Sequence, residues 1–77
     1  MTELEIQSKI EAGLACQSVS VSGDGYHFEA IVVSAEFEGK RSVARQQLVY
    51  ATVQDDIASG DLHAISLKTL TPAEAGL

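Results

Sequence analysis

The spacing of apolar residues predicts a helix at the start of the chain. Ile6, Ile10 and Leu14 recur at intervals of four, which places their side chains on one face of a helix. Thr2 and Glu5 have the spacing of a capping box, an arrangement that satisfies backbone N–H groups at a helix start. We therefore expect a first helix that begins directly after Thr2.

The next segment alternates instead of repeating every four residues. Val19 and Val21 are separated and flanked by serines, which is the period of a half-exposed strand. Gly-Asp-Gly at 23–25 favours a tight reversal, and a second apolar run follows at 28–34. The two segments should form an antiparallel hairpin, with His27 just past its turn.

A second helix is predicted over residues 42–59, and a third strand follows it. Val49, Val53 and Ile57 repeat at intervals of four, with Ser42 as the expected N-cap and Gly60 as the stop. Asp55 and Asp56 would lie near the C-terminal end of this helix, where the helix dipole disfavours negative charge. We expect these two carboxylates to be solvated or to contact cations of a partner.

The third strand opens with His63 and continues through 64–67, and Thr71-Pro72 is expected to begin a single final turn. The predicted order is α-β-β-α-β. A helical crossover favours parallel pairing of the two strands that it joins. We expect an α/β fold of the α+β type, with a three-stranded mixed sheet and helices on one face. The 77 residues have room for one domain, 1–77.

This topology places two histidines at one edge of the sheet. His27 and His63 each open a strand, and parallel strands begin at the same edge, so the two imidazoles could converge. Neutral imidazole is a common metal ligand and carries protons near neutral pH. The alternative is that both are ordinary residues at strand ends.

The chain is acidic overall but contains one short basic segment. A net charge of −6 argues against a general nucleic-acid binder. Lys40, Arg41 and Arg45 nevertheless form a short basic segment. It is either a partner-binding patch or the solvated start of a helix.

The remaining sequence features argue for a binding protein in a reducing compartment. The single cysteine, Cys16, cannot form an intramolecular disulfide and is expected to be a buried small hydrophobe. Without an apolar run of membrane-span length or a signal segment, the chain is expected to be soluble and cytoplasmic, with no membrane contact. No phosphate loop, nucleophile elbow or zinc motif is present, so we do not expect an enzyme.

The order of several segments resembles the BolA family, and within it the IbaG-like branch. They cover most of the chain after about residue 15: VSVSGDGYHF at 19–28, VSAEFEGK at 33–40, RQQLVY at 45–50 and HAISLKTLTP at 63–72. The chain departs from many relatives at Arg45-Gln46-Gln47, where they have Arg-His-Arg, and after Glu74, where they commonly have tryptophan. The first departure lowers the positive charge of the helix, and the second removes the basis for expecting a long C-terminal helix.

The resemblance implies a KH-like fold of the second topological class and an adaptor role in iron-sulfur cluster trafficking or iron homeostasis. The implied partner is a monothiol glutaredoxin, which would share a bridging [2Fe-2S] cluster and its bound glutathione with this chain. His63 matches the expected cluster ligand and His27 the candidate second one, while Lys40, Arg41 and Arg45 would meet carboxylates of the partner or of glutathione. Imidazole in place of thiolate raises a cluster's potential, as in Rieske centres.

The alternative that the resemblance leaves open is a KH-like transcriptional regulator that binds nucleic acid. The basic segment favours it. The acidic balance and the absence of a Gly-x-x-Gly loop count against it, since Gly39-Lys40-Arg41-Ser42 ends in serine.

Overall fold

The computed structural model describes residues Met1–Leu77, and its first helix, α1 (Glu3–Gly13), begins with the predicted capping box. Thr2 Oγ1 accepts the Glu5 N–H at 3.2 Å, and Glu5 Oε1 accepts the Thr2 N–H at 3.0 Å. Ile6 and Ile10 are fully buried. The predicted apolar stripe is therefore the face of α1 that packs against the rest of the protein.

Three strands form the mixed sheet that the sequence predicts. β1 (Ser18–Gly23) and β2 (His27–Val33) pair antiparallel as a hairpin, and β3 (Ala64–Leu70) pairs parallel with β2. The strand order is β1-β2-β3, so β2 is central. The parallel pairing confirms the expectation drawn from the helical crossover.

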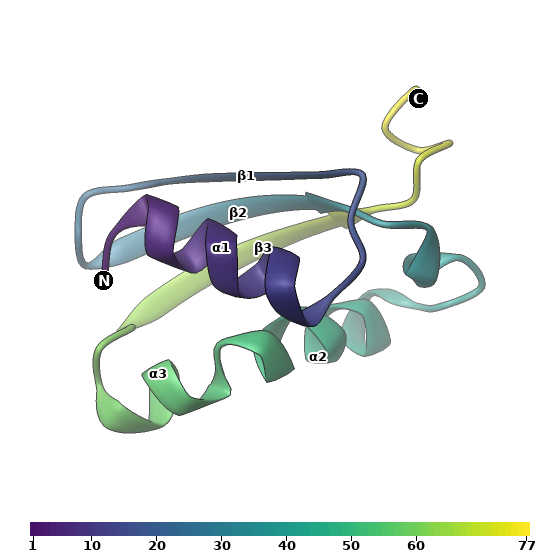
Figure 1. The fold of residues 1–77 in the computed structure, drawn as a ribbon. Coiled ribbons are helices and arrows are strands. Elements are labelled where there is room, and N and C mark those ends of the chain that lie inside the picture. Colours follow the sequence, from purple (N-terminus) through teal and green to yellow (C-terminus); the bar gives the residue numbers. More distant parts are fainter.

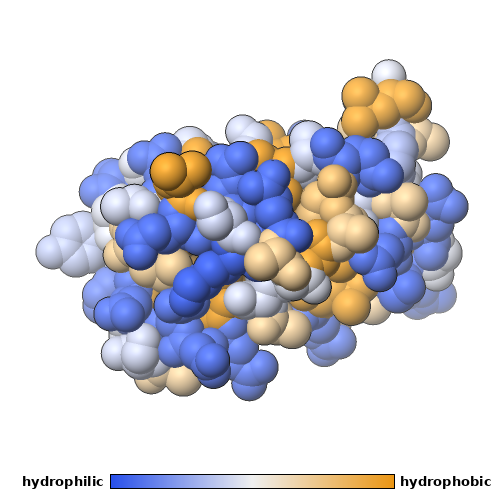
Figure 2. Space-filling model, viewed as in Figure 1, coloured by the Kyte–Doolittle hydropathy of each residue, from blue (hydrophilic) through white to orange (hydrophobic).

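The helices cover one face of this sheet and leave the other open (Figure 1). Strand residues alternate accordingly: Val19 of β1 and Phe28 of β2 are buried, whereas the serines of β1 are exposed on the other face. Seen from the helix side, the surface is mostly hydrophilic, with small separate apolar patches (Figure 2). The core consists of Ile6, Ile10, Leu14, Val19, Phe28, Ala30, Val32, Phe37, Val49, Val53 and Leu62.

The crossover is two helices instead of the single one predicted over residues 42–59. α2 (Ser42–Thr52) and α3 (Gln54–Ser59) meet at Val53, whose φ of −122° and ψ of 17° lie outside the helical range. Beside it, Thr52 Oγ1 donates a 2.6 Å hydrogen bond to the Val49 carbonyl. Such back-bonding by threonine competes with the helix pattern and bends helices. Val49 and Val53 are buried as the stripe predicts, but Ile57, which lies beyond the break, is 41% exposed.

The caps of these helices correct one expectation and confirm another. Ser42 is the first residue of α2 and not its N-cap, a position held by Arg41 without a side-chain capping bond. Gly60 ends α3 as predicted. Its φ of 85° is left-handed, a conformation that glycine adopts without strain.

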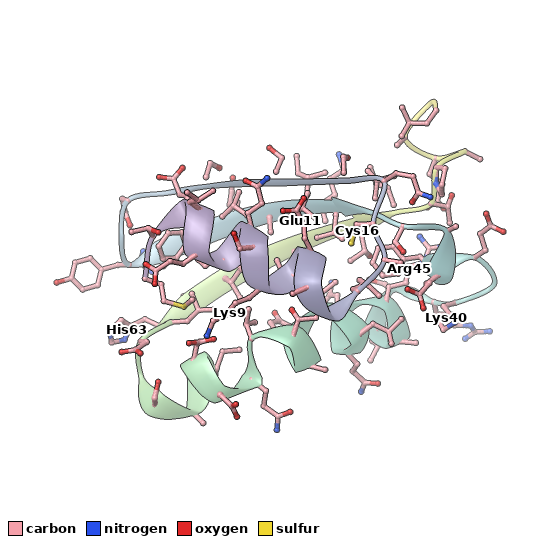
Figure 3. The ribbon with its side chains drawn as sticks, viewed as in Figure 1. Lys9, Glu11, Cys16, Lys40, Arg45 and His63 are labelled. Atoms are coloured by element: carbon pink, nitrogen blue, oxygen red, sulfur yellow. The ribbon has the colours of Figure 1, made fainter.

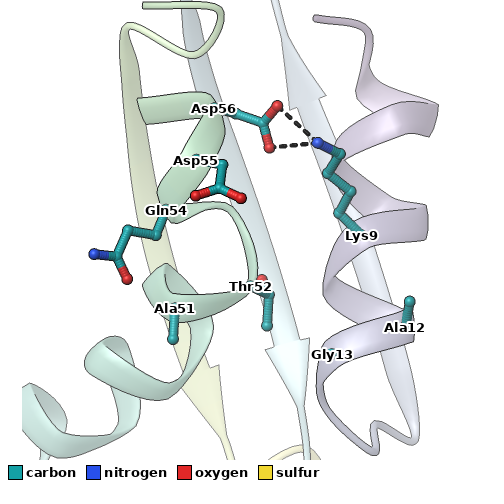
Figure 4. A pocket seen from close by; sticks show the side chains of 8 residues that line it. All are labelled: Lys9, Ala12, Gly13, Ala51, Thr52, Gln54, Asp55 and Asp56. Carbon is teal, nitrogen blue, oxygen red and sulfur yellow. Dashed lines mark hydrogen bonds and ion pairs between the residues drawn. The ribbon is translucent and has the colours of Figure 1, made fainter. Parts of the chain in front are cut away.

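The break also changes the surroundings of the two aspartates. Asp55 and Asp56 lie in the first turn of α3, where the helix dipole favours negative charge. Asp56 is buried, and its two carboxylate oxygens accept hydrogen bonds from Lys9 Nζ at 2.7 and 2.6 Å (Figure 4). The expectation of a solvated or partner-binding carboxylate is therefore wrong for Asp56, which joins α3 to α1. The pair borders a groove of about 400 Å³, and the carboxylate raises the pKa of Lys9.

The end of the sheet where β2 and β3 finish is closed by short turns. The 3₁₀ turn η1 (Ala35–Phe37) buries the Phe37 ring completely. After β3, Thr71 and Glu74 exchange side-chain and backbone hydrogen bonds of 2.8 and 3.2 Å, which forms the single turn expected there. None of the helices has the length and hydrophobicity that crossing a membrane requires.

Candidate functional site

Both histidines lie at one end of the sheet, where β2 and β3 begin. His27 is the first residue of β2, and His63 directly precedes Ala64, the first residue of β3. Because the two strands are parallel and His27 is in register with Ala64, both histidines belong to the same edge. The connectivity argument therefore placed the pair at the correct end of the molecule. We call this region the histidine end.

The register turns the two imidazoles toward opposite faces of the sheet, so they do not converge as the sequence predicted. Since His27 is opposite Ala64, the residue in line with His63 is Tyr26, and neighbouring strand residues point to opposite faces. The rings of Tyr26 and His63 accordingly pack together, with centroids 5.9 Å apart and planes tilted by 37°. Tyr26, which sequence reasoning did not select, is thus the aromatic neighbour of His63.

The hairpin turn fixes the backbone that carries Tyr26 and His27. Asp24 Oδ1 accepts both of their backbone N–H groups at 2.9 Å, and the Asp24 N–H donates to the His27 carbonyl at 3.3 Å. Gly25 supplies the left-handed residue that the turn needs, with a φ of 99°. The bonds from His27 and Tyr26 hold the pKa of Asp24 below its usual value, because they favour the charged carboxylate.

An apolar pocket of about 260 Å³ borders His63 on the helix side. Tyr50 of α2 closes part of it, and its hydroxyl donates a 3.3 Å hydrogen bond to the Ile65 carbonyl of β3. Among the lining residues, Leu62 is buried and Ile57 is 41% exposed. The lining residues are Tyr50, Ile57, Leu62, His63, Ala64 and Ile65. A partner that reaches His63 would find apolar surface beside it.

The predicted basic patch lies at the opposite end of the sheet, and its three members differ. Figure 3 shows Lys40 and Arg45 far from His63. The Arg45 side chain is only 14% exposed and forms an ion pair of 2.7 Å with Glu74. It also donates to the carbonyls of Lys40, at 2.7 Å, and Thr69, at 3.4 Å. Arg45 therefore holds the fold together, whereas Arg41 remains exposed.

Cys16 is a half-buried thiol away from the histidine end (Figure 3). Its Sγ donates to the Leu14 carbonyl at 3.2 Å. Burial raises the pKa of the thiol, and the carboxylates of Glu11 and Glu36 add to this effect. The raised pKa lowers the fraction of nucleophilic thiolate. Cys16 is therefore only half-buried and not buried as expected, and its raised pKa is that of an unreactive thiol.

Comparison with known proteins identifies the family. The family model described as "BolA-like protein" matches residues 1–74. The chain belongs to the BolA-like family. It is 46% identical to "Acid stress protein IbaG" of Escherichia coli (strain K12) over 74 residues, covering 96% of this chain and 88% of that protein.

Solved structures of BolA proteins share the fold. A bolA protein homologue from Coxiella burnetii superposes with a TM-score of 0.87 at 42% identity, covering 100% of this chain and 99% of the other. The BolA domain of SufE1 from Arabidopsis thaliana gives a TM-score of 0.81 at 34% identity, over 94% and 93% of the two chains. In this BolA-like fold, the histidine end therefore occupies a defined place: the hairpin turn and the start of the strand parallel to β2.

Within this BolA-like protein, the histidine end offers donor atoms that the fold does not use. Both imidazoles are exposed, and no hydrogen bond within the chain involves either ring. Nowhere do three or more His, Cys, Asp or Glu side chains form a group that could hold a metal ion. The two exposed rings are therefore the unpaired donor groups of the histidine end.

Proposed function

We propose that this BolA-like protein is a non-enzymatic adaptor that binds a monothiol glutaredoxin and contributes His63 to a bridging [2Fe-2S] cluster. The observation that carries the proposal is the exposed imidazole of His63, which has no hydrogen-bond partner at the histidine end. Its place beside an apolar pocket supports a protein partner, because such a pocket can take up an apolar side chain. The role would be in iron-sulfur cluster trafficking or iron homeostasis.

The donor chemistry fits a shared cluster better than a site within this chain. His63 has no cysteine beside it, and the only thiol, Cys16, is half-buried with a raised pKa. A glutaredoxin cysteine and its bound glutathione would supply the thiolates that iron-sulfur clusters require. Histidine in place of cysteine on one iron has precedent in Rieske centres, where it raises the reduction potential.

His27 is the proposed second ligand because it lies at the same end and on a backbone fixed by Asp24. It is on the strand position opposite Ala64, one residue out of step with His63. The side chain of His27 therefore points to the opposite face of the sheet from that of His63. We expect removal of His63 to have the larger effect on the cluster.

The test is a titration of glutathione-loaded [2Fe-2S] monothiol glutaredoxin with this protein, followed by visible absorption and circular dichroism. The wild type should produce a saturable spectral change, His63→Ala should abolish it, and His27→Ala should alter its shape or midpoint. Gln47→Ala, an exposed residue on α2, serves as a matched surface control. An unchanged titration with His63→Ala would exclude His63 as a ligand, and no change with the wild type would exclude the adaptor function.

The alternative function, a regulator that binds nucleic acid, stays a prediction, and fewer basic residues support it than the sequence suggested. Exposed Lys40 and Arg41 favour it, while Arg45 makes its contacts within the fold. Genuine binding to phosphates should weaken steeply as salt is added. Absence of any mobility shift with duplex or single-stranded DNA at low salt would rule it out.

A further inference from the structure

Tyr26 is an exposed aromatic residue at the hairpin turn. Its side chain is 68% exposed, although tyrosine usually buries much of its ring area. The ring nevertheless packs on that of His63, at a centroid distance of 5.9 Å. This distance falls within the 4.5–7 Å range of favourable aromatic pairs. Tyr26 therefore has a specific neighbour on an otherwise exposed surface.

The turn holds Tyr26 in place for this contact. Its backbone N–H donates to Asp24 Oδ1 at 2.9 Å, and the same oxygen accepts the next N–H along the chain, that of His27. The position from which the Tyr26 ring projects is thus fixed by two hydrogen bonds. His63 comes from a separate segment, directly before β3.

His63 lacks the usual means of orienting a histidine ligand. Metal-binding histidines commonly donate their second ring N–H to a carboxylate, carbonyl or water, and this bond fixes the ring. No group of this chain forms such a bond with His63, and the aromatic ring that packs against the imidazole is that of Tyr26.

We propose that Tyr26 is a positioning residue for His63, and that its ring holds the imidazole in the orientation used toward the partner's cluster. Only the statement about the partner's cluster rests on the proposed function. The contact itself belongs to the free protein and can be tested there.

The first test measures the side-chain NMR resonances of His63 in the free protein. Tyr26→Leu removes the aromatic ring, so the His63 ring protons should shift and their contacts to residue 26 should disappear. Tyr26→Phe keeps the ring and should retain both the shift and the contacts. Val43→Ala, a truncation of an exposed side chain on α2, is the control, and backbone amide spectra report whether each variant is folded. His63 resonances that are the same in Tyr26→Leu and wild type would overturn the proposal.

The second test repeats the cluster titration with the same variants. We expect Tyr26→Leu to raise the midpoint by about 2- to 10-fold, the range that corresponds to one lost aromatic pair. Tyr26→Phe should restore the wild-type midpoint and circular dichroism spectrum. If Tyr26→Phe behaves like Tyr26→Leu, the phenol oxygen is what matters, and positioning by the ring is wrong.

The two tests separate the two proposals. If the wild type fails to change the glutaredoxin spectrum, the proposed function fails, and the NMR experiment alone decides whether Tyr26 restrains His63. If the wild type succeeds and Tyr26→Leu matches it in midpoint and spectrum, the adaptor function stands and the positioning role is overturned.

Discussion

The two ends of the sheet use their polar and aromatic residues in opposite ways. At the end closed by η1 and the C-terminal turn, Phe37 is fully buried and Arg45 is bound to a carboxylate and two carbonyls. At the histidine end, Tyr26 is 68% exposed and the imidazoles of His27 and His63 make no hydrogen bond. The first end holds the fold together, and the second leaves its side chains available.

This difference shows that residue type alone does not identify an interaction surface. Arg45 has the chemistry to bind a partner's carboxylate, but it satisfies the carboxylate of Glu74 in its own chain. His63 lies at a strand start and has no such internal partner. The groups available for a partner are therefore those whose hydrogen-bonding capacity the fold leaves unused.

The largest difference in the loss of stability should be between substitutions of the two aromatic residues at opposite ends of the sheet. Phe37→Ala should lower the free energy of unfolding by about 3–5 kcal/mol, because it leaves a cavity in a fully buried site. Tyr26→Ala should lower it by less than about 1.5 kcal/mol, since only an exposed aromatic pair is lost. Urea unfolding followed by far-ultraviolet circular dichroism measures both values. If Phe37→Ala does not fold, Phe37→Leu gives a smaller loss that can still be measured, and equal losses for the two alanine variants would contradict the comparison.

A smaller contrast is expected between two arginines of the predicted basic patch. Arg45→Ala should cost about 1–2 kcal/mol of stability, because the carbonyls of Lys40 and Thr69 lose a charged donor. Arg41→Ala should change stability by less than about 0.5 kcal/mol, because Arg41 is exposed at the helix start without a capping bond. Chemical denaturation at one pH and salt concentration compares them. A loss with Arg41→Ala as large as that with Arg45→Ala would show that the patch acts as a unit.

The ion pair of Arg45 also predicts a pH dependence confined to acid. The Arg45 guanidinium, with the Thr71 N–H, holds the pKa of Glu74 below its ordinary value of 4.5. A lowered folded-state pKa contributes stability that is present above the unfolded-state value and is lost as the pH falls through the folded-state value. Wild type should therefore be more stable than Glu74→Gln near neutral pH, and the difference should shrink below about pH 4.5. Thermal unfolding across this range tests it, with Glu38→Gln as an exposed control; a constant difference would exclude the ion pair as its source.

Local patterns predicted the elements well, and tertiary contacts account for what they missed. The four-residue spacing of Ile6 and Ile10, and the reversal at 23–25, depend on neighbours in sequence, and both appear as expected. The break at Val53 places Asp56 against Lys9, 47 residues away, and no periodicity contains that contact. Arg45 likewise meets Glu74 from 29 residues away.

For the candidate site, the sequence likewise predicted the location but not the side-chain contacts. Connectivity placed His27 and His63 at one edge, because parallel strands begin together. Which side chain meets His63 depends on the register between β2 and β3. A shift of one residue in that register turns a side chain to the other face of the sheet. The contact with Tyr26 therefore needed the structure.

Small effects on stability are expected from the two residues with the largest expected effects on function. His27→Ala should change the free energy of unfolding by less than about 0.5 kcal/mol, because its exposed ring makes no hydrogen bond. His63→Ala loses the contact with Tyr26 and part of the pocket wall, so its cost should stay below about 1.5 kcal/mol. Denaturant unfolding of both variants beside wild type measures these changes. A stable His63→Ala protein that fails to alter the glutaredoxin spectrum would separate function from folding, whereas a loss of several kcal/mol would mean that the histidine end also supports the fold.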